Sequence, residues 1–148
     1  MNEIKKYDVD YLSSIEDVLD DAKKGKMFIL VDDEDRENEG DLCILAEFAN
    51  ADAINFMAKY GRGLICLTLN NSHAKKLGLN YMAPVNQSRN KTAFTISIEA
   101  KKGISTGISA KDRARTIKVA TKKNANKKDI VSPGHVFPII SKDGGVLI

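Results

Sequence analysis

The sequence of 148 residues has no apolar run that approaches the roughly 20 residues a membrane-spanning helix needs. Its first residues, Met1 to Lys6, lack the apolar segment of a secretory signal peptide. The two cysteines, Cys43 and Cys66, lie in separate apolar stretches and form no Cys-x-x-Cys pair, which argues against a disulfide framework or a zinc site. These absences predict a cytoplasmic protein that does not associate with a membrane.

Aromatic residues make up only 6% of the chain, and none lies in the basic segment from Lys111 to Lys128. That segment carries eight Lys or Arg residues and the single acid Asp112, so nucleic-acid binding is one interpretation. Proteins that bind single strands stack the bases on aromatic side chains, which this segment does not have. We therefore favour a solvated helix face and expect no nucleic-acid partner.

The length and composition are those of one soluble domain with a hydrophobic core, because 43% of the residues are hydrophobic and 29% are charged. We expect a single domain over residues 1–148. The last three residues, Val146 to Ile148, are apolar and would leave a strand end uncovered. We therefore expect this domain to be incomplete at its C-terminus.

Helical and strand patterns alternate along the chain. Ser13 and Glu16 predict a capping box, and Asn50 and Ser109 predict further helix N-caps. Short strands are expected at 27–31, 42–46, 63–68, 93–98 and 135–140, and a turn at 141–145 would lead into a last strand from Val146. In the strand 93–98, the side chains of Phe94, Ile96 and Ile98 should share one face. The alternation predicts an α/β or α+β fold with a mixed sheet covered on both faces.

The most unusual stretch is Asp32-Asp33-Glu34-Asp35-Arg36-Glu37-Asn38-Glu39-Gly40-Asp41, between two apolar runs that we interpret as buried strands. Seven carboxylates at this spacing repel one another unless a cation lies among them. Oxygen ligands without Cys or His favour a hard cation such as Mg²⁺ or Mn²⁺. A solvated acidic turn is the alternative, but the flanking apolar runs and the single arginine argue against it.

The eleven residues from Asp32 to Leu42 resemble the signature loop of the 3,4-dihydroxy-2-butanone 4-phosphate synthases, enzymes of riboflavin biosynthesis. Further matching segments follow in the family's order at residues 61–66, 92–95, 105–113 and 133–138. The resemblance implies a three-layer α/β sandwich around a mixed twisted sheet. Family members continue past the Gly-Gly-Val-Leu seen here into an Arg-x-Gly-His-Thr-Glu segment, so the resemblance implies that the final strands and helices are missing.

The implied activity is the conversion of D-ribulose 5-phosphate to L-3,4-dihydroxy-2-butanone 4-phosphate and formate by a homodimeric lyase that uses Mg²⁺ or Mn²⁺. Such chemistry needs a base beside a carbonyl, a cation at the resulting enediolate, and further acid and base groups. The alternative is a non-catalytic fragment or remnant of this family that binds a divalent cation. Because the family's later histidine and phosphate contacts are absent, we expect residues 1–148 alone not to turn over ribulose 5-phosphate.

Several loop residues match positions with known roles in the family. Glu37 matches the metal-binding glutamate, and Arg36, Glu37 and Asp41 match substrate contacts. Asp32 and Glu39 match other active-site acids. The remaining loop acids, Asp33, Glu34 and Asp35, are expected to be structural.

Three residues outside the loop also match. His135, within Pro-Gly-His-Val-Phe-Pro, matches an essential histidine, and Cys66 matches an active-site cysteine. Thr106 precedes a helix whose N-terminus could hold an anion, and its match makes it a candidate substrate contact. By contrast, His73 is expected at the surface and Cys43 as an unreactive core residue.

Overall fold

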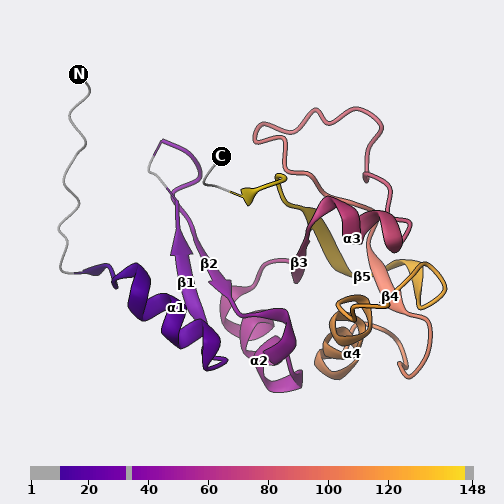
Figure 1. Cartoon of the computed structure of the whole chain (residues 1–148), viewed down its shortest axis with the longest axis horizontal. Coiled ribbons are helices and arrows are strands. Elements are labelled where there is room, and N and C mark those ends of the chain that lie inside the picture. Colours follow the sequence, from indigo (N-terminus) through magenta and orange to yellow (C-terminus); the bar gives the residue numbers. More distant parts are fainter. Residues whose placement is uncertain (1–10, 33–34, 146–148) are drawn as a thin grey trace. The chain divides into compact units, whose positions relative to one another are not determined.

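The computed structural model describes residues 11–32 and 35–145 (Figure 1). These residues belong to two compact units, one ending at Leu45 and one beginning at Ala46. The strand expected from Val146 lies outside the described residues. Within the described part of the chain, no helix has both the length and the apolar character needed to cross a membrane.

The first unit consists of helix α1 (Ile15–Lys23) and a two-stranded hairpin. The helix is capped by Ser14, whose side chain accepts a hydrogen bond from the Asp17 amide at 3.1 Å and donates one to the Asp17 carboxylate at 2.7 Å. The predicted capping box of Ser13 with Glu16 is therefore wrong by one residue. Both pairs have the same spacing, so the sequence pattern alone could not distinguish them.

The hairpin pairs strand β1 (Phe28–Val31) with strand β2 (Gly40–Cys43) in antiparallel register. The second strand begins two residues earlier than expected, because Gly40 pairs with Val31. The prediction that both strands are buried is wrong for three side chains: Ile29, Leu30 and Val31 are 60, 55 and 62% exposed. A two-stranded ribbon leaves the side chains of both faces accessible unless another layer covers them.

The second unit contains a three-stranded mixed sheet in the order β3-β5-β4. Strand β3 (Cys66–Leu69) is parallel to the long strand β5 (Ile130–Ile140), and β4 (Ile98–Ala100) is antiparallel to it. The expected mixed sheet is thereby confirmed. Strand β5 begins five residues earlier than predicted, because Ile130 and Val131 pair with β4.

The register between β4 and β5 changes abruptly at one point. Ile98 pairs with Val136, whereas the next residue, Glu99, pairs with Val131. Residues 132–135 of β5 therefore lie outside this ladder, and His135 is the last of them. Gly134 permits this arrangement, since a β-carbon there would lie 2.1 Å from the carbonyl carbon of Ile98.

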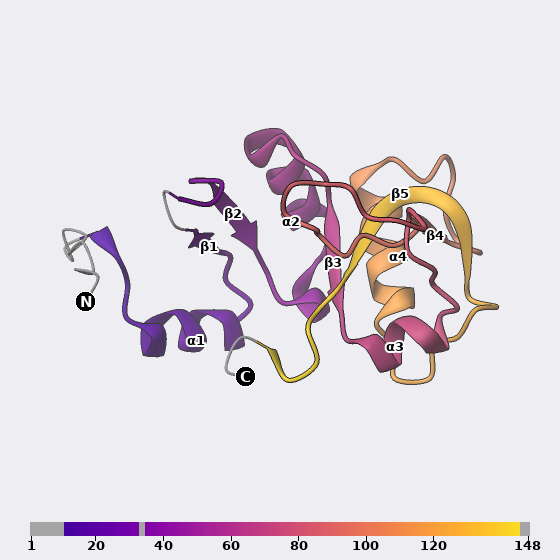
Figure 2. The ribbon, with the colours of Figure 1, turned by 90° about the horizontal axis from the view of Figure 1, so that it is seen from above.

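Helix α2 (Ala51–Phe56), extended by the π-helical turn η3 (Met57–Gly61), packs against helix α4 (Ala110–Ala120), which also contacts β4 and β5 (Figure 2). Asn50 and Ser109 cap α2 and α4 as predicted. A short 3₁₀ turn, η2 (Ala46–Phe48), precedes α2. The centre of the core consists of side chains with at most 3% exposure, including Ile54, Leu77, Ile98, Ile117 and Val136.

Two local predictions fail in this unit. The strand expected at 93–98 begins only at Ile98, and the buried side chain before it is Thr95, at 0% exposure, rather than Phe94 or Ile96. Thr95 takes this place because its amide and its hydroxyl both donate to the Pro138 carbonyl oxygen.

The predicted surface residue His73, in helix α3 (Asn71–Lys76), is half-buried instead. Its Nε2 donates to the Ala120 carbonyl oxygen at 2.7 Å, which connects α3 to the end of α4. The carbonyl belongs to a helix 47 residues away, so no local pattern could have indicated it.

Candidate functional site

The acidic loop of the first unit is closed by a carboxylate of its own. Asp32 Oδ1 accepts a hydrogen bond from the Glu39 amide at 2.9 Å, and its Oδ2 accepts one from the Glu37 amide at 3.2 Å. These amides, that of Glu39 first, hold the pKa of Asp32 below its usual range, and the positive charge of Arg36 acts in the same direction. The backbone between the two amides turns through Asn38, at a positive φ of 51°.

Arg36 lies between two of the loop acids. Its Nε is 3.7 Å from Asp32 Oδ2, and its Nη2 is 3.8 Å from Glu37 Oε2. The arginine side chain is 60% exposed, so solvent screens both pairs and each contributes little to stability. The contacts therefore orient the loop more than they stabilise the fold.

The described residues supply suitable donors for a hard cation, but no group of three. The carboxylate oxygens of Glu37, Glu39 and Asp41 are of the kind that Mg²⁺ prefers. No three acidic, His or Cys side chains among residues 11–32 and 35–145 are close enough together to hold a metal ion. Glu37 could therefore be one ligand of several. Asp33 and Glu34, expected to be structural, lie outside the described residues.

In the second unit, His135 contacts the carboxylate of Glu99 through its Nδ1 atom. The histidine side chain is 40% exposed and the glutamate side chain only 16% exposed. The ring can therefore reach a ligand with one nitrogen while the other is held by a largely buried carboxylate. Sequence analysis missed Glu99, although an acid within the apolar stretch Ile96-Ser97-Ile98-Glu99-Ala100 was a signal for it.

Cys66 lies close to this histidine in the sheet. It begins strand β3 and pairs with Phe137, which follows His135 by two residues on β5. Cys66 is exposed, so the predicted sugar contact has access to solvent. Cys43 is half-buried, and burial raises the pKa of its thiol, which disfavours the reactive thiolate.

Thr106 lies in a loop that is bound to the first turn of α4. The buried carboxylate of Asp112 accepts hydrogen bonds from the Ser105 hydroxyl at 2.8 Å, the Gly107 amide at 3.0 Å and the Ser105 amide at 3.2 Å. The Ser105 hydroxyl, followed by these amides, lowers the pKa of Asp112. Thr106 is exposed between the two bound residues, and Gly107 packs directly on Glu99. The fold thus places His135 and Gly107, the neighbour of Thr106, beside the carboxylate of Glu99.

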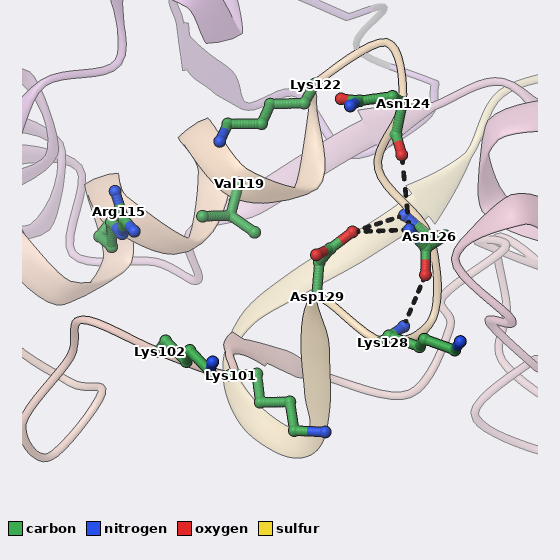
Figure 3. Close-up of a pocket in the computed structure, with 9 residues that line it drawn as sticks. All are labelled: Lys101, Lys102, Arg115, Val119, Lys122, Asn124, Asn126, Lys128 and Asp129. Carbon is green, nitrogen blue, oxygen red and sulfur yellow. Dashed lines mark hydrogen bonds between the residues drawn. The ribbon is translucent and has the colours of Figure 1, made fainter.

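The basic residues form a separate feature of the second unit. A surface pocket of about 360 Å³ is lined by Lys101, Lys102, Arg115, Val119, Lys122, Asn124, Asn126, Lys128 and Asp129 (Figure 3). The Asp129 carboxylate accepts hydrogen bonds from the backbone and the side chain of Asn126, both at 3.0 Å. None of the predicted catalytic, substrate or metal residues lines this pocket.

Comparison with known proteins shows which protein family the chain resembles. Residues 16–148 match the family model described as 3,4-dihydroxy-2-butanone 4-phosphate synthase. A protein of that name from Pseudomonas syringae pv. tomato is 58% identical over 133 residues, which are 90% of this chain and 36% of that protein. The chain spans well under half the length of the curated relatives it matches.

Solved structures agree with the family model. A two-domain 3,4-dihydroxy-2-butanone 4-phosphate synthase from A. baumannii is 47% identical, with a TM-score of 0.86 over 91% of this chain and 40% of that one. A synthase solved in complex with two magnesium ions is 37% identical, with a TM-score of 0.88 over 91% of this chain and 63% of that one. These likenesses confirm the α/β class expected from the sequence. The chain belongs to the 3,4-dihydroxy-2-butanone 4-phosphate synthase family.

Proposed function

We propose that this chain carries out, within its full gene product, the conversion of D-ribulose 5-phosphate to L-3,4-dihydroxy-2-butanone 4-phosphate and formate, a lyase step of riboflavin biosynthesis. Besides membership of the family, one observation carries the proposal. Asp32 closes the acidic loop on the amides of Glu37 and Glu39, so that Arg36 and several carboxylates lie in one constrained turn. A solvated acidic turn would need no such internal constraint.

Within this loop, Arg36, Glu37 and Asp41 would contact the substrate. Glu39 would move protons at the reacting carbons, and Asp32 would hold the segment that presents Glu37 and Glu39. Thr106, exposed in the second unit, would contribute a further hydrogen bond to the sugar phosphate. The planar guanidinium of Arg36 is suited to binding phosphate or carboxylate oxygens through two parallel hydrogen bonds.

Glu37 would be a ligand of Mg²⁺ or Mn²⁺. The oxygen-only donor set of the loop supports a hard cation, as does the magnesium complex of the 37%-identical relative. When bound, such an ion supplies positive charge that stabilises an enediolate oxygen. Arg36, 3.8 Å from the Glu37 carboxylate, would keep that side chain oriented.

His135 would act as a general base. Its ring is partly exposed, and its Nδ1 is engaged by Glu99, which leaves Nε2 to accept a proton from carbon beside the substrate carbonyl. Cys66, exposed at the start of the neighbouring strand, would line the same region.

The direct test is to incubate the full-length gene product with ribulose 5-phosphate and Mg²⁺ and to follow formate and the four-carbon phosphate by ¹³C NMR. We expect both products in equal amounts. Binding of the divalent cation without formate release would favour the alternative, a non-catalytic cation-binding member of the family.

We also propose that the full-length protein is a cytoplasmic homodimer. The exposed apolar side chains Ile29, Leu30 and Val31 support a partner surface, because exposed apolar patches commonly mark interfaces. Light scattering should give twice the monomer mass. A monomer with full activity would contradict the dimer without affecting the proposed reaction.

A further inference from the structure

Glu99 stands out among the acidic residues of the second unit because it is largely buried and points at a histidine. It lies on β4 at the point where the ladder with β5 changes register, and its side chain is 16% exposed. Its Oε1 contacts His135 Nδ1. A carboxylate is seldom buried without a hydrogen-bond or ion-pair partner. The contact with His135 is therefore what allows Glu99 to occupy a largely buried position.

The surrounding backbone leaves space for this carboxylate. Gly107 adopts φ +85°, and a β-carbon there would lie 1.8 Å from Glu99 Oε1. A β-carbon at Gly134 would lie 2.5 Å from the Glu99 side-chain carbon Cγ. Two glycines from separate segments thus lie directly against the side chain of Glu99.

We propose that Glu99 is a positioning residue for His135: it holds the imidazole in one orientation and in the tautomer with the proton on Nδ1. This inference rests on the proposed function for its catalytic consequence, but not for the tautomer itself. The Nδ1–H group donates to the carboxylate, and the lone pair of a neutral ring is then on Nε2. Only in that tautomer can Nε2 act as a base toward substrate.

The stretch from Ser132 to His135 explains why such help is needed. These residues lie outside the β4–β5 ladder, so strand pairing does not orient the ring. The Gly134 amide donates to Ser97 Oγ at 3.0 Å, which anchors the backbone just before His135 but leaves the ring free to rotate about its own bonds. The carboxylate of Glu99 supplies the missing constraint.

The test uses the full-length gene product labelled with ¹⁵N-histidine, as wild type and as Glu99→Gln. At a pH of about 8 an ordinary imidazole is neutral, and its two ring-nitrogen shifts report the tautomer. The signals of His135 are identified by their absence in His135→Asn, which separates them from those of His73. Glu47→Gln, which changes an exposed glutamate on η2, is the matched control.

We expect wild type and Glu47→Gln to show His135 with its proton on Nδ1, and Glu99→Gln to shift a large share of the ring to the Nε2–H form. With ribulose 5-phosphate, kcat should fall about 100-fold in Glu99→Gln, while KM changes by less than about threefold. Glu99→Asp keeps the negative charge, so its kcat should be at least about tenfold higher than that of Glu99→Gln.

Unchanged tautomer populations in a folded Glu99→Gln protein would overturn the inference, as would a kcat within about twofold of wild type. If wild type releases no formate at all, the proposed function fails, and the tautomer measurement alone decides the role of Glu99. If Glu99→Gln does not fold, Glu99→Asp provides the comparison. In Glu99→Asp, a shift of the tautomer population together with a reduced kcat supports the inference. A wild-type tautomer population together with a wild-type kcat contradicts it.

Discussion

Asp32 Oδ1 lies 2.9 Å from the backbone nitrogen of Glu39, so one end of the acidic loop is held directly against the other. The second carboxylate oxygen accepts from the Glu37 amide, so a single side chain constrains both residues that we propose to act on metal and substrate. An acidic loop of this charge would otherwise expand by repulsion between its carboxylates.

Replacing Asp32 with asparagine should therefore impair the loop without unfolding the protein. The amide retains one acceptor oxygen but cannot serve both backbone groups and also attract Arg36. We expect formate release to fall at least about tenfold, with a melting temperature within a few degrees of wild type. Circular dichroism and a formate assay measure the two effects, and an unchanged rate would show that the closure is not needed.

Glu37→Gln should abolish metal-dependent formate production while the fold remains intact. The substitution removes one ligand charge with almost no change of volume. Binding of Mn²⁺, followed by electron paramagnetic resonance, should weaken in parallel. Glu16→Gln, at an exposed position of α1, is the control and should behave as wild type. Near-normal activity of Glu37→Gln at saturating Mg²⁺ would remove Glu37 from the proposed metal site.

Gly107→Ala should destabilise the protein far more than Gly145→Ala. Both glycines have positive φ, at 85° and 76°, so each substitution carries a backbone cost of roughly 1–2 kcal/mol. Nothing lies within 4 Å of a β-carbon at Gly145, whereas one at Gly107 would overlap the Glu99 carboxylate. We expect an additional loss of about 1–3 kcal/mol at Gly107, from urea unfolding. Equal losses would mean that Glu99 moves aside at no cost.

Asp112 should contribute stability that depends on pH in the acid range. Its folded pKa is lowered by the Ser105 hydroxyl and by backbone amides, so the folded state favours the charged carboxylate. The contribution is therefore fully present above the ordinary carboxyl range near pH 4 and is lost as the pH falls through the lowered folded pKa.

The check is urea unfolding of wild type and Asp112→Asn between about pH 7 and pH 3. The difference in unfolding free energy between them should be constant at the upper end and should shrink below about pH 4. A difference that grows toward acid would have the wrong sign for a lowered pKa.

The basic pocket of Figure 3 should not retain nucleic acid at physiological salt. No aromatic side chain lines it, and the Asp129 carboxylate places negative charge among the lysines. Fluorescence anisotropy with single- and double-stranded oligonucleotides should give no binding at about 150 mM salt. Binding there that is lost in Lys122→Glu would instead establish a nucleic-acid function.

The sequence by itself determined the family and several local features. The acidic loop was recognised from its composition, and Asn50 and Ser109 were identified as caps because an N-cap interacts with residues only two or three positions away. The ion pairs of Arg36 are local in the same way, since its partners Asp32 and Glu37 are four residues and one residue distant.

Only the tertiary structure decided the partners that are distant in sequence. Glu99 meets His135 across 36 residues, and His73 meets Ala120 across 47, because strand pairing and helix packing place them together. The register change between β4 and β5 was likewise not predicted, since register depends on which residues of two distant segments pair. The alternation of side chains along a strand reveals which residues can share a face. The pairing of strands decides which side chains of neighbouring strands meet.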